Sequence, residues 1–162
     1  MREWILDAIA IGMGATAFMD LAALARKHLF GTSLADYALV GRWIASMPRG
    51  RFVHRPIAVS PAVRGEAVIG WSVHYLTGIV FAGVLLAVAG EGWARHPTIL
   101  PALAVGIGSV AAPFLLMQPG MGLGIAAHRT PNPAAARGRS LITHALFGMG
   151  LYGGGLAASF WR

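Results

Sequence analysis

Three ionisable residues lie inside stretches that are otherwise apolar enough to cross a lipid bilayer: Asp20, His74 and His144. An ionisable side chain is costly in hydrocarbon, so its presence there indicates a functional role. An aspartate and two histidines can relay protons or line an ion path, because histidine titrates near neutral pH. His74 and His144, on different helices, could also ligate a metal or a haem iron, and two histidines with one carboxylate form a known catalytic metal site. The sequence assigns no particular cofactor.

The three residues also lie at a similar depth. Each is four to seven residues from the end of its stretch that faces the same side of the membrane. With a helical rise of about 1.5 Å per residue, this places them roughly 6 to 11 Å from that end. We expect one polar layer formed by Asp20, His74, His144, Thr16, Thr77 and Gln118. The alternative is that hydrogen bonds between packed helices satisfy these groups and only fix the helix register.

A second group of polar and basic residues surrounds the start of the last apolar stretch. Arginines beside a helix start can bind an anion, and the neighbouring hydroxyl and amide groups can add hydrogen bonds. The alternative is anchoring to lipid headgroups. The group consists of His128, Arg129, Thr130, Asn132, Arg137 and Arg139, which His54 and Arg55 could join.

The elements that must position these residues are membrane helices. Of the 162 residues, 56% are apolar and only 12% are charged, and the mean hydropathy is +0.63. A helix needs about 20 residues to cross the hydrocarbon core. Four stretches are long enough, at residues 4–25, 67–89, 98–117 or longer, and 140–161. We therefore predict an all-α polytopic membrane protein, a bundle of four transmembrane helices forming a single domain over residues 1–162.

The basic residues predict the orientation of the chain in the membrane. Ten of the thirteen Lys and Arg residues fall in two segments, 26–64 and 129–139, and three fall elsewhere. The positive-inside rule then places both segments in the cytoplasm and both termini on the other side. The net charge of +7 is explained by this topology, so we do not expect a nucleic-acid partner.

The first basic segment is long for a connection and contains an amphipathic pattern. Ser33 to Asp36 resembles a helix-capping box, and the apolar residues from Leu34 to Met47 form a broad stripe. We expect a short interfacial helix, lying on the headgroups beside Arg42, Arg49 and Arg51.

The third stretch contains prolines near its end. Pro113 and Pro119 cannot donate a backbone hydrogen bond, so the helix could be broken at either residue. Residues 118–124 are expected to be irregular near the cytoplasmic boundary.

Small residues recur at a spacing of four inside the apolar stretches, which is typical of close contact between membrane helices. This pattern does not distinguish packing within the chain from a homo-oligomer. The spacings are Gly12 with Thr16, Ala104 with Gly108 and Ala112, Gly120 with Gly124, and Gly150 with Gly154.

Several segments together resemble a known family over nearly the whole chain. They are Gly12–Thr16 with Asp20, Gly70–Trp71 leading to His74–Gly78, Met117–Gly122 with Arg129–Pro133, and His144 with Phe147–Gly148 and Leu151–Tyr152. The sequence resembles the DUF2938 family of small bacterial inner-membrane proteins, a domain of unknown function. The resemblance implies a bacterial inner-membrane location and assigns no catalytic or ligand role.

The residues favour a non-enzymatic function. No combination of them has the geometry of an acyl-transfer triad, and the absence of cysteine excludes a thiolate metal site and a cysteine nucleophile. We expect the protein to bind or move a small solute or ion through the layer of Asp20, His74 and His144. The alternatives are a haem- or metal-binding redox protein and a non-catalytic membrane assembly protein.

Overall fold

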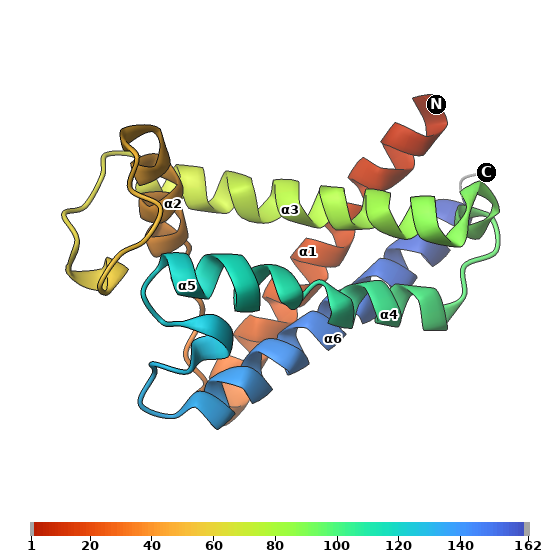
Figure 1. The fold of residues 1–162 in the computed structure, drawn as a ribbon. Helices are drawn as coiled ribbons and strands as arrows, with labels where there is room; N and C mark the ends of the chain where they lie inside the picture. The colour runs from red at the N-terminus through yellow and green to blue at the C-terminus, as the bar shows by residue number, and fades with distance from the viewer. Residues whose placement is uncertain (1, 161–162) are drawn as a thin grey trace. The chain divides into compact units, whose positions relative to one another are not determined.

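The computed structural model describes residues 2–160, and the regular secondary structure of this part of the chain consists of helices, without strands (Figure 1). Four stretches are long and apolar enough to cross a membrane, at Arg2–Phe30, Glu66–Ala89, Ile99–Gly120 and Pro133–Ser159. The predicted all-α fold with four such helices is therefore confirmed. The predicted end of the fourth stretch, Trp161, lies outside the described residues. The helices are α1 (Arg2–Phe30), α2 (Tyr37–Ser46), α3 (Glu66–Ala89), α4 (Ile99–Gly108), α5 (Gln118–Gly120) and α6 (Pro133–Ser159).

The first helix continues beyond the apolar stretch that predicted it. α1 ends at Phe30 rather than near Ala25, because Lys27 and His28 in its last turn are favourable beside the helix carbonyls. Gly31 then stops the helix with a φ of +65°. Arg26, which the sequence placed in a loop, is thus a helical residue.

The last helix begins before its apolar stretch. Pro133 is the first residue of α6, a position at which proline needs no hydrogen-bond donor. The Asn132 side chain accepts a hydrogen bond from the Ala135 nitrogen at 3.0 Å and so caps the helix. The polar residues between 133 and 140 are therefore helical, although hydropathy alone excluded them.

The third stretch is distorted but continues to Gly120. α4 ends at Gly108, a turn follows at residues 109–110, and Pro113–Met117 form a π-helical segment before α5. Proline has no N–H to offer the preceding turn, which accounts for the altered hydrogen bonding at Pro113. The irregular backbone predicted to begin at residue 118 begins instead at Met121.

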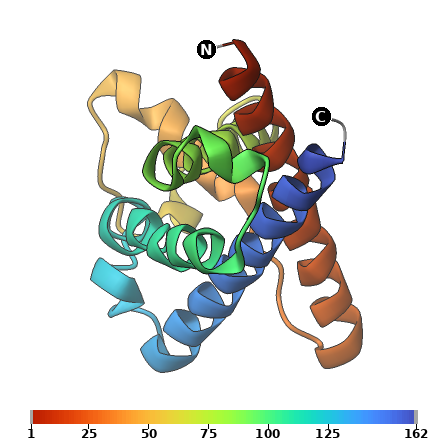
Figure 2. The same ribbon diagram turned by 90° about the vertical axis from the view of Figure 1, so that its right-hand side faces the viewer.

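The chain divides into two compact units. The first comprises residues 2–34, 75–109 and 141–160, and the second comprises residues 35–74 and 110–140. The first unit contains an apolar core built from α1, α3, α4 and α6, whose largest fully buried members are Ile11, Leu85, Leu86 and Leu151. Figure 2 shows α1 and α6 crossing within this unit.

Glycines set the helix spacing in the first unit. A methyl group built on Gly12 would lie 2.5 Å from the Cα of Ile79, and one on Gly150 would lie 2.8 Å from the Ala15 oxygen. Gly106 on α4 contacts Gly148 on α6, and a methyl group built on Gly106 would lie 2.5 Å from the Gly148 nitrogen. The spacings that contain Gly12 and Gly150 therefore serve contacts within the chain.

Other predicted spacings do not form such contacts. Gly108 has nothing within 4 Å of an added methyl group, so the spacing of Ala104, Gly108 and Ala112 is not explained by packing around that glycine. Gly120 and Gly124 do not form a helix face, because Gly124 lies beyond the end of α5 with a φ of +74°.

In the second unit, α2 packs closely on the beginning of α3. Added methyl groups on Gly41 or Gly70 would collide with the backbone of Glu66 or Tyr37, respectively. α2 begins at Tyr37 because the Asp36 carboxylate accepts a hydrogen bond from the Ala38 nitrogen at 3.0 Å. The short helix predicted in this segment is thus present, with Asp36 rather than Ser33 as its cap, and its interfacial position stays a prediction.

An ion pair fixes the loop between α2 and α3. Arg42 donates from Nε and Nη2 to the two carboxylate oxygens of Glu66, at 2.8 and 2.7 Å. Nη1 donates to the Ser60 carbonyl at 2.9 Å. The Glu66 carboxylate raises the pKa of the Arg42 guanidinium above its ordinary value. The donors of Arg42 are therefore occupied by contacts within the second unit.

Candidate functional site

Asp20 is held by a tyrosine from another helix. The Tyr75 phenol on α3 donates a hydrogen bond to the carboxyl group of Asp20 on α1, and both side chains are half-buried. One turn before Asp20, the fully buried Thr16 donates to the Gly12 carbonyl at 2.8 Å. Thr16 leaves no room for a side chain on Gly78. The close approach of the two helices at these small residues brings Tyr75 within reach of Asp20.

His144 is held in the same way by a serine. Its Nδ1 lies 2.7 Å from the Ser109 Oγ, and the same Oγ donates to the Gly106 carbonyl at 2.6 Å. A serine hydroxyl has a single proton, so a Ser109 that donates it to Gly106 accepts a hydrogen bond from the Nδ1 of His144, which corresponds to the Nδ1–H tautomer. In the neutral ring, Nε2 is then the nitrogen that can take up a proton.

The two pairs lie on the same side of the crossing of α1 and α6. These helices are antiparallel, since Ala15 contacts Gly150 and Ile11 contacts Gly154. Asp20 is five residues beyond Ala15 and His144 is six residues before Gly150. At about 1.5 Å per residue, they lie roughly 7.5 and 9 Å from the crossing.

A cation follows at the same end of these helices. Arg26 donates from Nη2 to the Thr143 Oγ1 at 3.0 Å, and its buried Nε has no hydrogen-bond partner. Thr143 precedes His144 on α6. The first unit therefore contains Asp20, His144 and Arg26 on the facing ends of two helices.

The remaining members of the predicted layer are distributed over both units. Thr77 is in the first unit, on the exposed side of α3. In the second unit, the His74 ring stacks on Tyr37 with ring centroids 4.0 Å apart, and Trp71 packs on His74 in an edge-to-face arrangement with ring centroids 5.7 Å apart. Gln118 is 6% exposed, and its Oε1 has no hydrogen-bond partner.

Sequence reasoning missed Ser109, Tyr75 and Arg26 as partners. Hydroxyl groups are common in membrane helices, so neither Ser109 nor Tyr75 gave a signal on its own. Arg26 was counted as a loop residue. Among the side chains that the structure describes, no three His, Asp or Glu residues gather in a way that could hold a metal ion.

The predicted anion-binding group falls entirely within the second unit, where several members bind the local backbone. The Thr130 Oγ1 donates to the Ala127 carbonyl, and Arg137 Nε donates to the Ala126 carbonyl, each at 2.8 Å. His128 Nδ1 lies 3.2 Å from the Ile125 carbonyl, and Asn132 caps α6. These contacts hold a turn in which Ala126 and Ala127 have φ values of +48° and +58°.

The other members of the group divide into exposed and buried side chains. Arg55, Arg129 and Arg139 are exposed. His54 is only 8% exposed, its Nδ1 lies 3.0 Å from the Ser60 Oγ, and its backbone nitrogen donates to the Gly120 carbonyl at 2.8 Å. His54 therefore joins its loop to the end of α5, whereas the three arginines are on the outer surface of the unit.

Comparisons with known proteins place the chain in a family without assigning an activity. No curated protein and no solved structure matches it. The model of a family described as a protein of unknown function, DUF2938, matches residues 9–158, which confirms the resemblance given by the sequence motifs. The chain therefore belongs to the DUF2938 family.

Proposed function

We propose that this protein is a bacterial inner-membrane protein that moves protons, alone or coupled to a small solute, through a polar layer containing Asp20 and His144. One observation carries the proposal. Each of these ionisable residues lies in an apolar helix and is held by a hydroxyl group from another helix of the same unit. Titratable groups in membrane helices are typical of proton relays.

The two pairs are suited to transient protonation. Asp20 can take up a proton and return it while Tyr75 keeps the carboxyl group oriented. His144 can take up a proton at Nε2 without losing the Nδ1 hydrogen bond to Ser109, because Nδ1 is a donor in both charge states. Thr16 and Thr77 of the same unit would complete the layer, and the inclusion of His74 and Gln118 stays a prediction.

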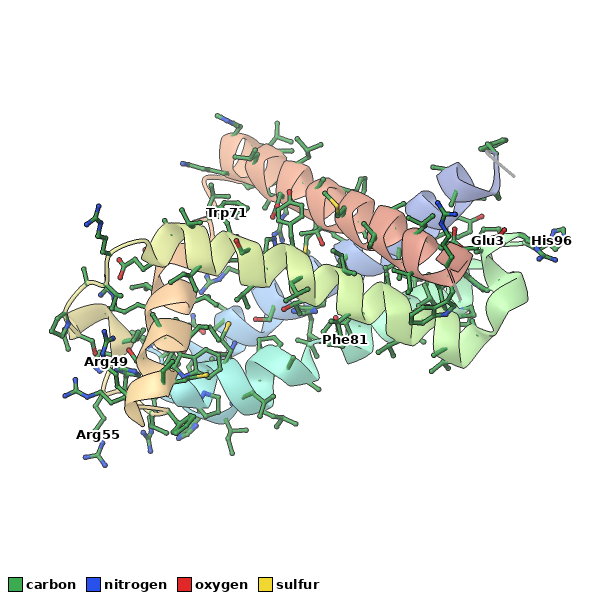
Figure 3. All side chains as sticks on the ribbon, turned by 90° about the horizontal axis from the view of Figure 1, so that it is seen from above. Glu3, Arg49, Arg55, Trp71, Phe81 and His96 are labelled. Carbon is green, nitrogen blue, oxygen red and sulfur yellow. The ribbon has the colours of Figure 1, made fainter. Side chains whose placement is uncertain are left out.

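The proposed orientation has both termini outside the cytoplasm. It rests on the ten basic residues of segments 26–64 and 129–139, against three elsewhere. In the first unit, Glu3 and His96 lie at the same end, which agrees with placing the start of α1 and the α3–α4 connection on one side of the membrane (Figure 3).

Proton flux into liposomes tests the function directly. The purified protein is reconstituted with a pH-sensitive dye inside the vesicles, and a membrane potential is imposed with potassium and valinomycin. We expect Asp20→Asn and His144→Gln each to abolish the protein-dependent flux. Asp7→Asn is the matched control, because it makes the same change elsewhere on α1. Wild-type flux in both layer variants, with folding verified by circular dichroism, would refute the proposal.

Metal or haem binding is the second candidate, favoured by one contact. Histidines that bind metals through one ring nitrogen are usually oriented by a hydrogen bond at the other, as Ser109 does for His144. Metal analysis and an absorption spectrum of the detergent-purified protein test this candidate. A stoichiometric metal or a haem band that His144→Ala removes would support it, and a protein free of both would eliminate it.

A further inference from the structure

Most of the positive charge belongs to the second unit. Its segments, 35–74 and 110–140, contain eight of the thirteen Lys and Arg residues but only two of the six Asp and Glu residues. Both acids are occupied, since Glu66 binds Arg42 and Asp36 caps α2. The Arg42–Glu66 contact is a salt bridge with a 2.7 Å distance between Nη2 and Oε1. Seven arginines of this unit therefore have no carboxylate partner within the described chain.

Three of these arginines surround exposed apolar side chains in the loop after α2. Residues 49–55, which we call the basic finger, contain Arg49, Arg51 and Arg55, all exposed. Between them, Phe52 is 59% exposed and Val53 is 67% exposed. Figure 3 shows Arg55 extending away from the ribbon, with Arg49 at the same end of the unit.

The backbone of the basic finger is fixed by the unit beneath it. Gly50 turns the chain with a φ of +74°, and the Trp43 Nε1 donates to the Phe52 carbonyl at 2.8 Å. The next residue, His54, is buried and its nitrogen donates to the Gly120 carbonyl. The structure thus presents Phe52 and Val53 outward from an anchored base.

The chemistry of this surface matches an anionic bilayer. Exposed phenylalanine and valine side chains are unfavourable in water and favourable at the acyl boundary. Guanidinium groups bind phosphate with paired hydrogen bonds and are attracted to anionic headgroups. A soluble anion would account for the arginines but not for the apolar side chains between them.

We infer that the basic finger is an interfacial anchor, which inserts Phe52 and Val53 into an anionic leaflet while Arg49, Arg51 and Arg55 bind lipid phosphates. The sequence predicted a helix lying on the headgroups beside Arg42, Arg49 and Arg51, and the inference moves the lipid contact from that helix to the loop after it. Arg42 on α2 is occupied by Glu66, so the loop after the helix is the part that reaches the lipid. The inference requires insertion of the chain in a bilayer and does not depend on proton transport.

A single label can measure this insertion, because the chain contains no cysteine. Val53→Cys carries a nitroxide, and the full-length protein is reconstituted in phosphatidylcholine vesicles with or without phosphatidylglycerol. Collision with oxygen, relative to a water-soluble nickel chelate, reports depth, and Val80→Cys on the exposed face of α3 is the hydrocarbon reference. We expect the label at position 53 to be immersed in the anionic vesicles and to move toward water in the neutral ones.

Charge variants show whether the arginines cause the insertion. A triple variant with Gln at positions 49, 51 and 55 should lose most of the dependence of insertion on anionic lipid. Each arginine removed should lower the partitioning of the basic finger into the anionic leaflet about fivefold. Arg95→Gln, in the first unit, is the control and should leave it unchanged. If the triple variant is unstable, the labelled protein with all three arginines is measured at increasing salt concentration, which should reverse the insertion.

Two results would overturn the inference. One is a label at position 53 that the nickel chelate reaches equally in both kinds of vesicle. The other is displacement of the label by inorganic phosphate at constant ionic strength, which would show that the arginines bind a free anion rather than the lipid surface.

Discussion

Replacing Gly106 by alanine should destabilise the protein, whereas the same replacement two residues later, at Gly108, should not. Both glycines are in α4, but only Gly106 faces another helix. Its added methyl group would lie 2.5 Å from the Gly148 nitrogen, while that of Gly108 would have nothing within 4 Å. Comparing the two variants therefore separates the effect of helix packing on stability from the effect of alanine's higher helix propensity.

The expected size of the difference follows from the contact. Nonbonded carbon contacts are optimal at about 3.5–4.0 Å, so α4 and α6 would have to separate by roughly 1 Å. Such overpacking typically costs about 1–3 kcal/mol, and alanine returns up to about 1 kcal/mol of helix propensity. We expect Gly106→Ala to lower the free energy of unfolding by about 1–2 kcal/mol and Gly108→Ala to leave it unchanged or raise it slightly.

The assay is thermal unfolding in detergent, followed by tryptophan fluorescence, with oligomeric state measured by size exclusion. For a chain of this size, about 1 kcal/mol corresponds to roughly 2–4 °C in Tm. Equal Tm values for the two variants would refute the assigned α4–α6 contact. A Gly108→Ala variant that changes only oligomeric state would show that the open face of α4 serves a homo-oligomer.

Three further predictions concern single contacts. Ser109→Ala should lower the free energy of unfolding by about 0.5–2 kcal/mol, because it removes the partner of the His144 Nδ1. It should also shift the pH dependence of proton flux, whereas the control Ser140→Ala should leave that dependence unchanged. Glu66→Gln should lower the Tm, and Arg42→Gln should add little in that background, because the two changes break one ion pair in a double-mutant cycle. Asn132→Ala should lower the Tm by the equivalent of about 1 kcal/mol through loss of the α6 cap, measured by the same unfolding assay.

Hydropathy predicted the four long helices because a span of this length needs an almost unbroken apolar run, and the sequence has four of them. It could not predict their ends. Helix formation continues past the apolar run where polar residues have good helix propensity and a cap follows, as at Phe30 and Pro133. Arg26 was therefore assigned to a loop although it is part of α1.

The partners of the ionisable residues were not predictable from one sequence. A charge in an apolar run is conspicuous, so Asp20 and His144 were identified. Their partners, Tyr75 and Ser109, are neutral and come from other helices, and finding them requires knowing which helix faces meet. Spacing along one helix identified Gly12 and Gly150 but not the pairing of Gly106 with Gly148.

The contact between Gly106 and Gly148 and the hydrogen bond between Ser109 and His144 depend on the same spacing between two helices. Ser109 is three residues after Gly106, and His144 is four residues before Gly148, so one helical turn connects the contact to the hydrogen bond on each side. Separating the helices by roughly 1 Å would lengthen the 2.7 Å Ser109–His144 distance beyond that of a hydrogen bond. Gly106→Ala should therefore reduce proton flux as well as stability, and Gly108→Ala should reduce neither. Flux that survives Gly106→Ala at a temperature where the protein stays folded would mean that the Ser109 contact is structural and is not needed for proton transfer through His144.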